Sequence, residues 1–478
     1  MNLSDLIDSG RLAAGGLRDF AVGLASPSLR LGVTGLSRAG KTVFITSLVQ
    51  ALLKGGRLPA FEAHAGGRIS RVYLEPQPDD GLPRFPYEDH LEALSEGETR
   101  HWPEGTRQIS QLRLTIEYEP RGLVARTVGS GKLHVDIIDY PGEWLLDLPL
   151  MGMGYARWSA LTIAASRTGP RLARAQDWHA HLTTLDAAAR ADEGQAIRAA
   201  QLFTAYLASC RDDDASLSAL PPGRFLMPGD FAGSPLLAFA PLDVAEDASF
   251  ASGSLGALMA RRYDSYVARI VKPFFFGNFA RLDRQIVLVD ALSALNAGAA
   301  AVNDLQTALA GILACFRQGS NSIVSSLFGR RIDRILFAAT KADLLHQTSH
   351  DRLEKILRLI VEEAANRAEY SGAEIDVVAL AAIRATREAR VTQKGETLDC
   401  IAGTPEKGET IGNQVFDGNT EAAIFPGDLP ENPRAALDGS LEGHLKFVRF
   451  RPPLKRLETF PHIRMDRAAE FLIGDRLA

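Results

Sequence analysis

The segment Gly35-Leu36-Ser37-Arg38-Ala39-Gly40-Lys41-Thr42 has the residue types and spacing of a loop that binds the phosphates of a nucleotide. Glycines let backbone N–H groups converge on a phosphate, and a helix beginning at Lys41 adds the positive potential of its N-terminus. The Lys41 ammonium can bridge the outer phosphates, and the Thr42 hydroxyl can coordinate Mg²⁺. We therefore assign phosphate binding to Gly35, Ser37, Arg38, Ala39, Gly40, Lys41, Thr42 and Val43.

A second motif follows an apolar strand and reads Asp139-Tyr140-Pro141-Gly142. A carboxylate at the end of such a strand can hold Mg²⁺ through water, and the Gly142 N–H can bind the terminal phosphate. An ordinary tight turn is the alternative for this pattern alone, but a phosphate loop earlier in the chain favours the metal site. Asp136 alternates with the motif residues, so we interpret it as a charge at the solvent or the sheet edge.

A third motif, Thr340-Lys341-Ala342-Asp343, ends another apolar strand. The Asp343 carboxylate can accept two hydrogen bonds from the edge of a guanine base, while the Lys341 stem lies along the base plane. This pairing rejects adenine, whose edge has a different donor pattern. The alternative is that Asp343 caps the N-terminus of the next helix.

The elements around these motifs must bring the three loops together. The pattern predicts a strand before Gly35, a helix over Lys41 to Leu53, and a pair of strands over Gln111 to Glu119 and Lys132 to Asp139. Residues 66–86 are rich in glycine, proline and acidic residues and resemble a linker.

Further along, strand-like runs at residues 284–290, 334–340 and 374–382 alternate with helical stretches. Strands that alternate with helices require a parallel sheet covered on both faces. We therefore predict an α/β fold of the P-loop NTPase class: a mostly parallel sheet between layers of helices, with a large α-helical insertion in the alanine-rich region after the second motif.

The order of the three motifs resembles that of the Ras-type GTPase domain. More narrowly, Trp102-Pro103, Thr106, the Asp139 to Trp144 turn and the 284–290 strand look like the bacterial YcjX family. That resemblance implies a stress-linked cytosolic protein that binds GTP or GDP with Mg²⁺. It also suggests a membrane-embedded protein as the partner, beside an effector or activator that the sequence does not name.

The resemblance extends the predicted site. It implies Thr106 as the switch threonine and as a third metal ligand beside Thr42 and Asp139, with Ser110 as the alternative. It also sets Ala381, Ala382 and Ile383 behind the base. Ras-type proteins have a water-orienting glutamine where this chain has Glu143, whose charge repels the terminal phosphate, so we expect slow hydrolysis. A structural salt bridge is the alternative role for Glu143. The predicted catalytic set is Lys41, Glu143, Thr106 and Arg38, with Arg100 a second candidate for a catalytic arginine.

The predicted domain organisation follows from these assignments. Residues 1–26 form an N-terminal helix, 27–146 the first part of the GTPase domain, 147–283 the helical insertion, 284–390 the second part, 391–444 an irregular excursion, and 445–478 a strand over Lys446 to Phe450 and a helix that complete the domain.

Composition limits the remaining classes of function. The chain has 478 residues and a formal net charge of −5, so we expect no nucleic acid partner. It has no apolar run long enough to cross a bilayer, and its three cysteines are widely spaced. We expect a cytoplasmic protein without a transmembrane segment; a peripheral contact with the inner membrane through residues 1–26 is an alternative.

Two other functions remain open on the sequence. An ATPase on the same phosphate loop requires Asp343 to be a helix cap. A non-catalytic scaffold with a structural nucleotide stays open because Glu143 stands where Ras-type proteins have the water-orienting glutamine.

Overall fold

The computed structural model describes residues 27–36, 38–121, 131–211, 217–315, 332–370, 372–393, 395–454 and 458–478. The predicted helix over residues 1–26 and the phosphate-binding residue Ser37 lie outside these ranges.

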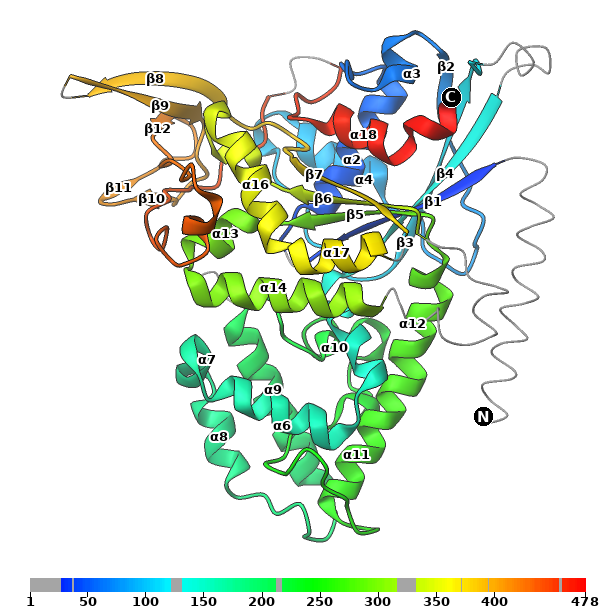
Figure 1. The fold of residues 1–478 in the computed structure, drawn as a ribbon, viewed down its shortest axis with the longest axis vertical. Helices are drawn as coiled ribbons and strands as arrows, with labels where there is room; N and C mark the ends of the chain where they lie inside the picture. The colour runs from blue at the N-terminus through cyan, green and yellow to red at the C-terminus, as the bar shows by residue number, and fades with distance from the viewer. Residues whose placement is uncertain are drawn as a thin grey trace.

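Seven strands of the described residues form one sheet, in the order β2-β3-β4-β1-β5-β6-β7 (Figure 1). They are β1 (Ser28–Gly35), β2 (Ile69–Glu75), β3 (Ser110–Tyr118), β4 (Gly131–Asp139), β5 (Arg284–Val289), β6 (Arg334–Ala339) and β7 (Glu374–Ala379). β4, β1, β5, β6 and β7 run parallel, whereas β2 and β3 are antiparallel to their neighbours. The predicted α/β P-loop fold is confirmed.

The register of the parallel strands brings the three motifs to one edge of the sheet. Val33 pairs with Asp139, and Ala339 pairs with both Val289 and Ala379. The carboxyl ends of β1, β4, β6 and β7 are therefore level, which is where open α/β sheets bind their ligands.

Both faces of the sheet are covered by helices, as the alternation of its buried side chains requires. Ile286 and Leu288 of β5 pack in the core under α2 and α18, while Val287 and Val289 pack in the core under α13, α14 and α16. The helices are α2 (Lys41–Lys54), α3 (Glu62–Ala65), α4 (Tyr87–Ser95), α13 (Ala291–Asn296), α14 (Ala299–Ala314), α16 (His350–Ile360), α17 (Glu362–Tyr370) and α18 (Met465–Ile473).

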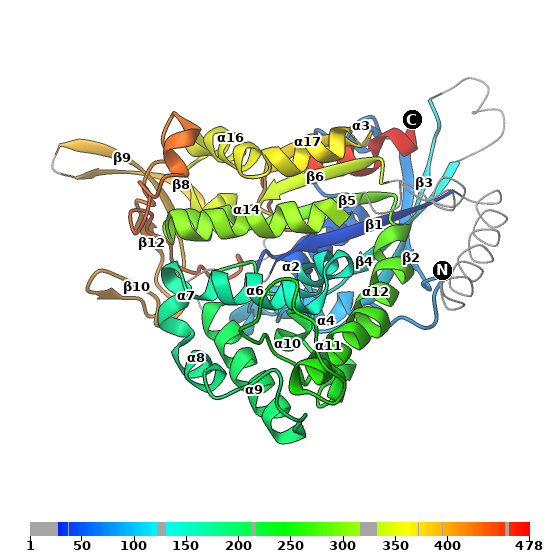
Figure 2. The ribbon, with the colours of Figure 1, turned by 60° about the horizontal axis from the view of Figure 1, so that its bottom comes forward.

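All described elements between β4 and β5 are helical, and they form a separate mass on the far side of α14 (Figures 1 and 2). They are η2 (Gly142–Gly152), α6 (Tyr155–Ser166), α7 (Gly169–Arg174), α8 (Gln176–Leu182), α9 (Glu193–Cys210), α10 (Gly223–Leu226), η3 (Gly229–Phe231), η4 (Pro235–Leu237), α11 (Leu255–Tyr266), η5 (Val267–Val271), α12 (Lys272–Gly277) and η6 (Phe279–Arg281). Aromatic rings such as Trp158, Phe203 and Tyr263 fill their common core. None of the described helices combines the length and the apolar character that a bilayer crossing needs.

The region after β7, whose composition indicates irregular or hairpin-like structure, contains short strands. A hairpin of β8 (Arg387–Gln393) and β9 (Glu396–Gly403) projects away from the main sheet, and β12 (Ala422–Ile424) pairs with β9 (Figure 1). Shorter elements are η1 (Gly97–Thr99), η8 (Ala342–Leu344), η9 (Gln347–Ser349), β10 (Thr410–Ile411), β11 (Gln414–Val415), η10 (Pro433–Ala436) and η11 (Gly474–Leu477). The strand predicted over Lys446 to Phe450 is wrong: only an isolated bridge from Phe450 to Pro405 forms there.

Two other predictions are wrong at the opposite edge of the sheet. The linker-like region contains β2, which pairs with β3 as the edge strand. Asp136 is not a solvent charge, because its side chain is 2% exposed and forms a two-pronged ion pair with Arg113 across the β3–β4 pair, at 2.6 and 2.8 Å. The ion pair compensates the charge that the sequence pattern alone assigned to solvent.

This buried pair yields a stability prediction. We expect Arg113→Ala to lower the free energy of unfolding by roughly 3 kcal/mol, because it leaves the Asp136 carboxylate buried without its partner. Urea unfolding of the nucleotide-free protein measures the effect. Arg84→Ala is the control, since it breaks an exposed Arg84–Glu88 pair and should cost under about 1 kcal/mol. Equal losses for the two variants would contradict the prediction.

Candidate nucleotide-binding site

The phosphate loop joins β1 to α2 and is shaped by its glycines. Gly40 has a φ of 82°, in the left-handed region that glycine adopts without strain, and it immediately precedes α2. The Lys41 ammonium donates a hydrogen bond of 2.8 Å to the Gly35 carbonyl, so it lies over the opening of the loop. Arg38 is exposed and has a φ of 64°, which is unusual for a residue with a side chain.

Gly142 lies directly against this loop. A Cβ atom at Gly142 would be 1.8 Å from the Gly35 carbonyl oxygen, so only glycine allows the turn after β4 to approach so closely. The contact sets the Gly142 backbone beside the phosphate loop, where the sequence predicted a ligand of the terminal phosphate.

Three predicted metal ligands meet beside the loop, from segments far apart in sequence. The Thr106 hydroxyl donates to Asp139 Oδ2 at 2.7 Å, and its oxygen lies 3.5 Å from the Thr42 hydroxyl oxygen. The alternative switch residue, Ser110, is instead buried at the start of β3.

The Asp139 carboxylate suits a cation. It is buried, and Oδ1 has no hydrogen-bond partner among the described residues. Burial raises its pKa to about 6, against the lowering effects of the Lys41 charge and the Thr106 hydrogen bond. A buried carboxylate oxygen beside two hydroxyls is a hard oxygen donor set, which fits Mg²⁺.

The base-recognition motif follows β6 and is held from two sides. Lys341 has a φ of 60°, and its ammonium forms a 2.6 Å ion pair with Asp290 at the end of β5. Thr340 is buried, and its backbone N–H donates to the Val289 carbonyl. Asp290 therefore orients the lysine stem, a role that the sequence prediction missed.

Asp343 connects this motif to the loop after β7. Its Oδ2 accepts the Ala385 N–H at 2.9 Å, and burial raises its pKa to about 6. It does not act as an N-cap of a following described helix, because η8 is preceded by Lys341 and α16 by Ser349.

The three residues predicted behind the base form this same loop. Ala381 and Ile383 are buried, and the Ala382 carbonyl accepts a 2.6 Å hydrogen bond from Ser47 of α2. Val43, in the first turn of α2, packs against the small cluster that contains Ile383. The base loops and the phosphate loop thus share α2 as a support.

The profile of the YcjX-like family, DUF463, matches residues 29–477. The chain belongs to the YcjX-like family. It is 36% identical over 460 residues to the Ras-like GTPase YcjX of Escherichia coli K12, covering 94% of this chain and 96% of that protein. It is also 36% identical over 479 residues to the Ras-like GTPase YcjX of Shewanella oneidensis MR-1, covering 95% of each.

Glu143 and Arg100, two of the candidates for a catalytic role, lie in different surroundings. Glu143 is buried, and its Oε1 lies 3.4 Å from Arg211, the residue that ends α9 of the insertion. The Arg100 guanidinium is engaged by the backbone, since it donates hydrogen bonds to the carbonyls of Gly97 and Pro452.

Sequence reasoning missed two arginines of the insertion that contact the turn after Gly142. Beside Arg211, the buried Arg224 stacks on the Trp144 ring, 3.1 Å from its centroid. Burial lowers the pKa of Arg224 to about 10. No motif signals either residue, because both lie more than 60 positions beyond the turn.

Because the Asp139 carboxylate is buried, we predict that the stability of the protein depends on pH. Its folded pKa of about 6 exceeds the model-peptide value, so the folded state binds the proton more tightly and stability falls as pH rises from about 4 to 6. Above pH 6 the penalty is roughly 3 kcal/mol, and Asp139→Asn removes it.

Thermal unfolding without nucleotide or Mg²⁺ should therefore show Asp139→Asn melting several degrees above the parent at pH 7.5. The difference should shrink as the pH falls towards 4. Asp147 and Asp343, whose pKa values burial also raises to about 6, titrate in both proteins and cancel in the comparison. A difference in melting temperature between the two proteins that stays constant from pH 7.5 to pH 4 would contradict the prediction.

Proposed function

We propose that this chain binds GTP and GDP with Mg²⁺, hydrolyses GTP slowly and acts as a nucleotide-state switch. The observation that carries the proposal is the convergence of Thr42, Thr106 and Asp139 at the same sheet edge as the Asp343 loop. The names of the curated relatives, Ras-like GTPases, support the same activity.

The reaction is attack of water on the γ-phosphorus, which breaks the bond to the β–γ bridging oxygen and yields GDP and phosphate. Lys41 and the N-terminus of α2 would stabilise the charge on the phosphate oxygens, and the Gly142 N–H would bind the γ-phosphate. Thr42, Thr106 and Asp139 would hold Mg²⁺, which neutralises charge on the outer phosphates when bound.

Guanine selectivity is proposed to depend on Asp343. A capping aspartate would bond N–H groups two or three residues further on, whereas Asp343 accepts an N–H from a loop 42 positions away. This bond leaves Asp343 at the junction of the two base loops, which supports a base-reading role over the ATPase alternative.

The slow rate follows from the charges at the switch turn. Glu143 would oppose the negative γ-phosphate, and its carboxylate is engaged by Arg211 rather than free to orient water. Arg38, in the exposed part of the phosphate loop, stays a candidate for the catalytic cation. A non-catalytic scaffold is the remaining alternative, and measured turnover that Asp139→Asn abolishes would exclude it.

The switch is proposed to act in the cytoplasm through a protein effector that contacts the insertion. Cys210, Cys315 and Cys400 are buried and unpaired, which fits a reducing compartment. The links to stress response, to a membrane-embedded partner and to peripheral membrane contact rest on the family resemblance alone.

The first test is competition for labelled GDP with Mg²⁺. We expect excess GDP or GTP to displace the label and excess ATP to fail. Asp343→Asn should weaken GDP binding by roughly a hundredfold or more, because an amide N–H₂ then faces the donors of guanine. The same variant should gain affinity for xanthosine diphosphate, whose C2 carbonyl accepts from the new amide.

Gain of xanthosine diphosphate binding also serves as the folding control for this variant. Equal displacement by ATP in the parent protein would overturn the guanine assignment and favour the ATPase alternative.

A second prediction concerns the Glu143–Arg211 pair. Arg211→Ala should weaken GTP binding about fivefold more than GDP binding, because an unpaired carboxylate beside the γ-phosphate costs roughly 1 kcal/mol. Adding Glu143→Gln to Arg211→Ala should restore the ratio. The control is Arg198→Ala, an exposed arginine of the same helix, which should leave both affinities unchanged. An unchanged ratio in Arg211→Ala would contradict the prediction.

A further inference from the structure

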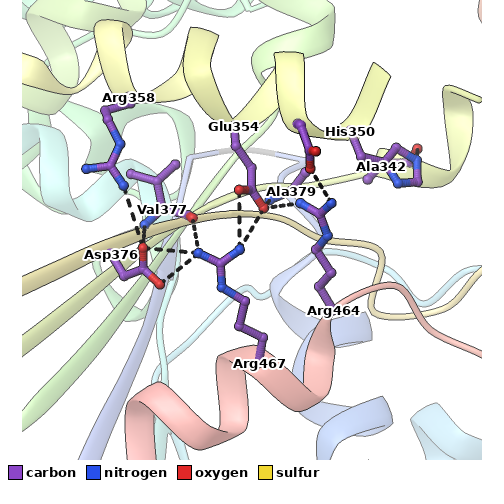
Figure 3. Close-up of polar contacts among 10 residues, drawn as sticks. Ala342, His350, Glu354, Arg358, Asp376, Val377, Ala379, Arg464 and Arg467 are labelled. Atoms are coloured by element: carbon purple, nitrogen blue, oxygen red, sulfur yellow. Dashed lines mark hydrogen bonds and ion pairs between the residues drawn. The ribbon is translucent and has the colours of Figure 1, made fainter. Parts of the chain in front are cut away.

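Helix α16 contacts the base-recognition motif through a buried histidine. His350 Nε2 lies 2.9 Å from the Ala342 carbonyl oxygen (Figure 3). It also lies 3.3 Å from the Leu345 carbonyl oxygen, so this nitrogen carries the proton and donates. Ala342 is the residue between Lys341 and Asp343. The histidine therefore holds the motif by its backbone, one residue from the proposed base-reading carboxylate.

One turn further along the same helix, Glu354 contacts the end of β7. The loop that follows β7 carries Ala381 to Ile383 and is the second base loop. Glu354 Oε1 accepts the N–H of Ala379, the last residue of β7, at 3.0 Å. β7 is the edge strand of the sheet, so this N–H has no neighbouring strand to bond on that side. Residues four apart lie on the same helix face, which lets His350 and Glu354 hold the two loops together.

Two arginines at the start of α18 fix the Glu354 carboxylate. Arg464 forms a short ion pair with Oε1, and Arg467 lies 3.2 and 3.3 Å from the two carboxylate oxygens (Figure 3). Arg467 also bonds Asp376 of β7 at 3.0 Å. The Glu354 side chain is 18% exposed, so these ion pairs are partly shielded from water.

The segment before α18 completes the support. Ile463 forms an antiparallel bridge with Ala381, with hydrogen bonds of 3.2 and 2.8 Å between their backbones. The Leu380 carbonyl accepts the Ala342 N–H at 3.1 Å, which joins the two base loops directly. The loops are thus held at Ala342 and Ala379 by one helix and at Ala381 by the C-terminal segment.

We infer that His350 and Glu354 are positioning residues for guanine selectivity, and that Arg464 and Arg467 act through Glu354. Among the described residues, their hydrogen bonds and ion pairs reach neither the phosphate loop nor the proposed metal ligands, so we expect them to set the geometry of base recognition and to leave the chemical step alone. This inference rests on the proposed GTP-binding function. It assigns part of the guanine selectivity to residues of α16 and at the start of α18 that support the Asp343 motif and the loop after β7.

The test compares GDP with inosine diphosphate, which lacks the 2-amino group that a guanine-reading carboxylate accepts. We expect Glu354→Ala to lower GDP affinity about tenfold and to narrow the preference for GDP over inosine diphosphate about fivefold, because the loops lose a held N–H. His350→Ala should act in the same direction. The turnover number at saturating GTP should stay within about twofold of the parent in both variants.

Two variants separate positioning from stability. Glu354→Gln keeps an oxygen that accepts the Ala379 N–H but loses the ion pairs, so it should narrow the preference for GDP about as much as Arg467→Ala and less than Glu354→Ala. Arg358→Ala is the matched control on α16, because Arg358 is 60% exposed and contacts Asp376 at 3.6 Å, and it should leave nucleotide binding unchanged. If Glu354→Ala does not fold, as judged by circular dichroism, Glu354→Gln and Arg467→Ala carry the test, with Arg467→Ala narrowing the preference.

Each outcome supports the inference, overturns it, or overturns the proposed function on which it rests. A folded Glu354→Ala or His350→Ala with reduced urea stability but the parent's preference for GDP overturns the inference, and so does a narrowed preference in Arg358→Ala. A parent protein that does not prefer guanine over adenine overturns the proposed function instead. A narrowed preference with unchanged turnover supports the inference.

Discussion

The Asp139 carboxylate is the constraint around which the carboxyl-end edge of β4 and the turn after it are built. It is buried, one oxygen accepts a hydrogen bond from Thr106, and the other has no hydrogen-bond partner among the described residues. Burying a carboxylate without a full set of partners costs several kcal/mol. The surrounding fold must therefore fix it by other means, and it does so through the pairing of β4 with β1 and β3 and through the contact of Gly142 with Gly35.

The same turn is also the point where the helical insertion joins the sheet. Asp147, five residues beyond Gly142, is buried and accepts hydrogen bonds of 2.6 Å from the Tyr266 hydroxyl and the Gly223 N–H. Arg224 stacks on Trp144, and Arg211 pairs with Glu143. The insertion thus holds the residues after Gly142 through three separate contacts, so a displacement of the turn requires the insertion to move or these contacts to break.

The parts of the site that could be predicted from the sequence are those in which chemistry and strand context lie in one short segment. The phosphate loop, Asp139 and the 340–343 motif each follow an apolar run, and each lies at the predicted strand end. The alternation of strands and helices was likewise sufficient for the α/β fold. Thr106 came from family resemblance, because nothing in its own neighbourhood distinguishes it from a surface threonine.

The predictions that were wrong, and the residues that were missed, depend on partners distant in sequence. The prediction of Asp136 as a solvent charge was wrong because its ion-pair partner lies on a neighbouring strand, where strand alternation gives no sign of it. β2 was missed because its acidic and glycine-rich surroundings resemble a linker, and an edge strand needs no apolar face on both sides. Arg211 and Arg224 reach the turn only after the insertion folds, so no local pattern could reveal them.

The same difference separates two parts of the proposed site. The phosphate loop lies in one short segment of sequence, and the residues proposed for base recognition come from distant segments. In the predicted phosphate loop that segment is Gly35 to Thr42, and it leads directly into α2. The residues proposed for base recognition instead depend on β6, β7, α16 and the segment before α18, which are brought together across about 120 residues from Ala342 to Ile463. Under the proposed function, changes near the C-terminus would lower base selectivity and leave the phosphate loop intact. The C-terminal helix packs in the same hydrophobic core as α2, the helix that follows the phosphate loop.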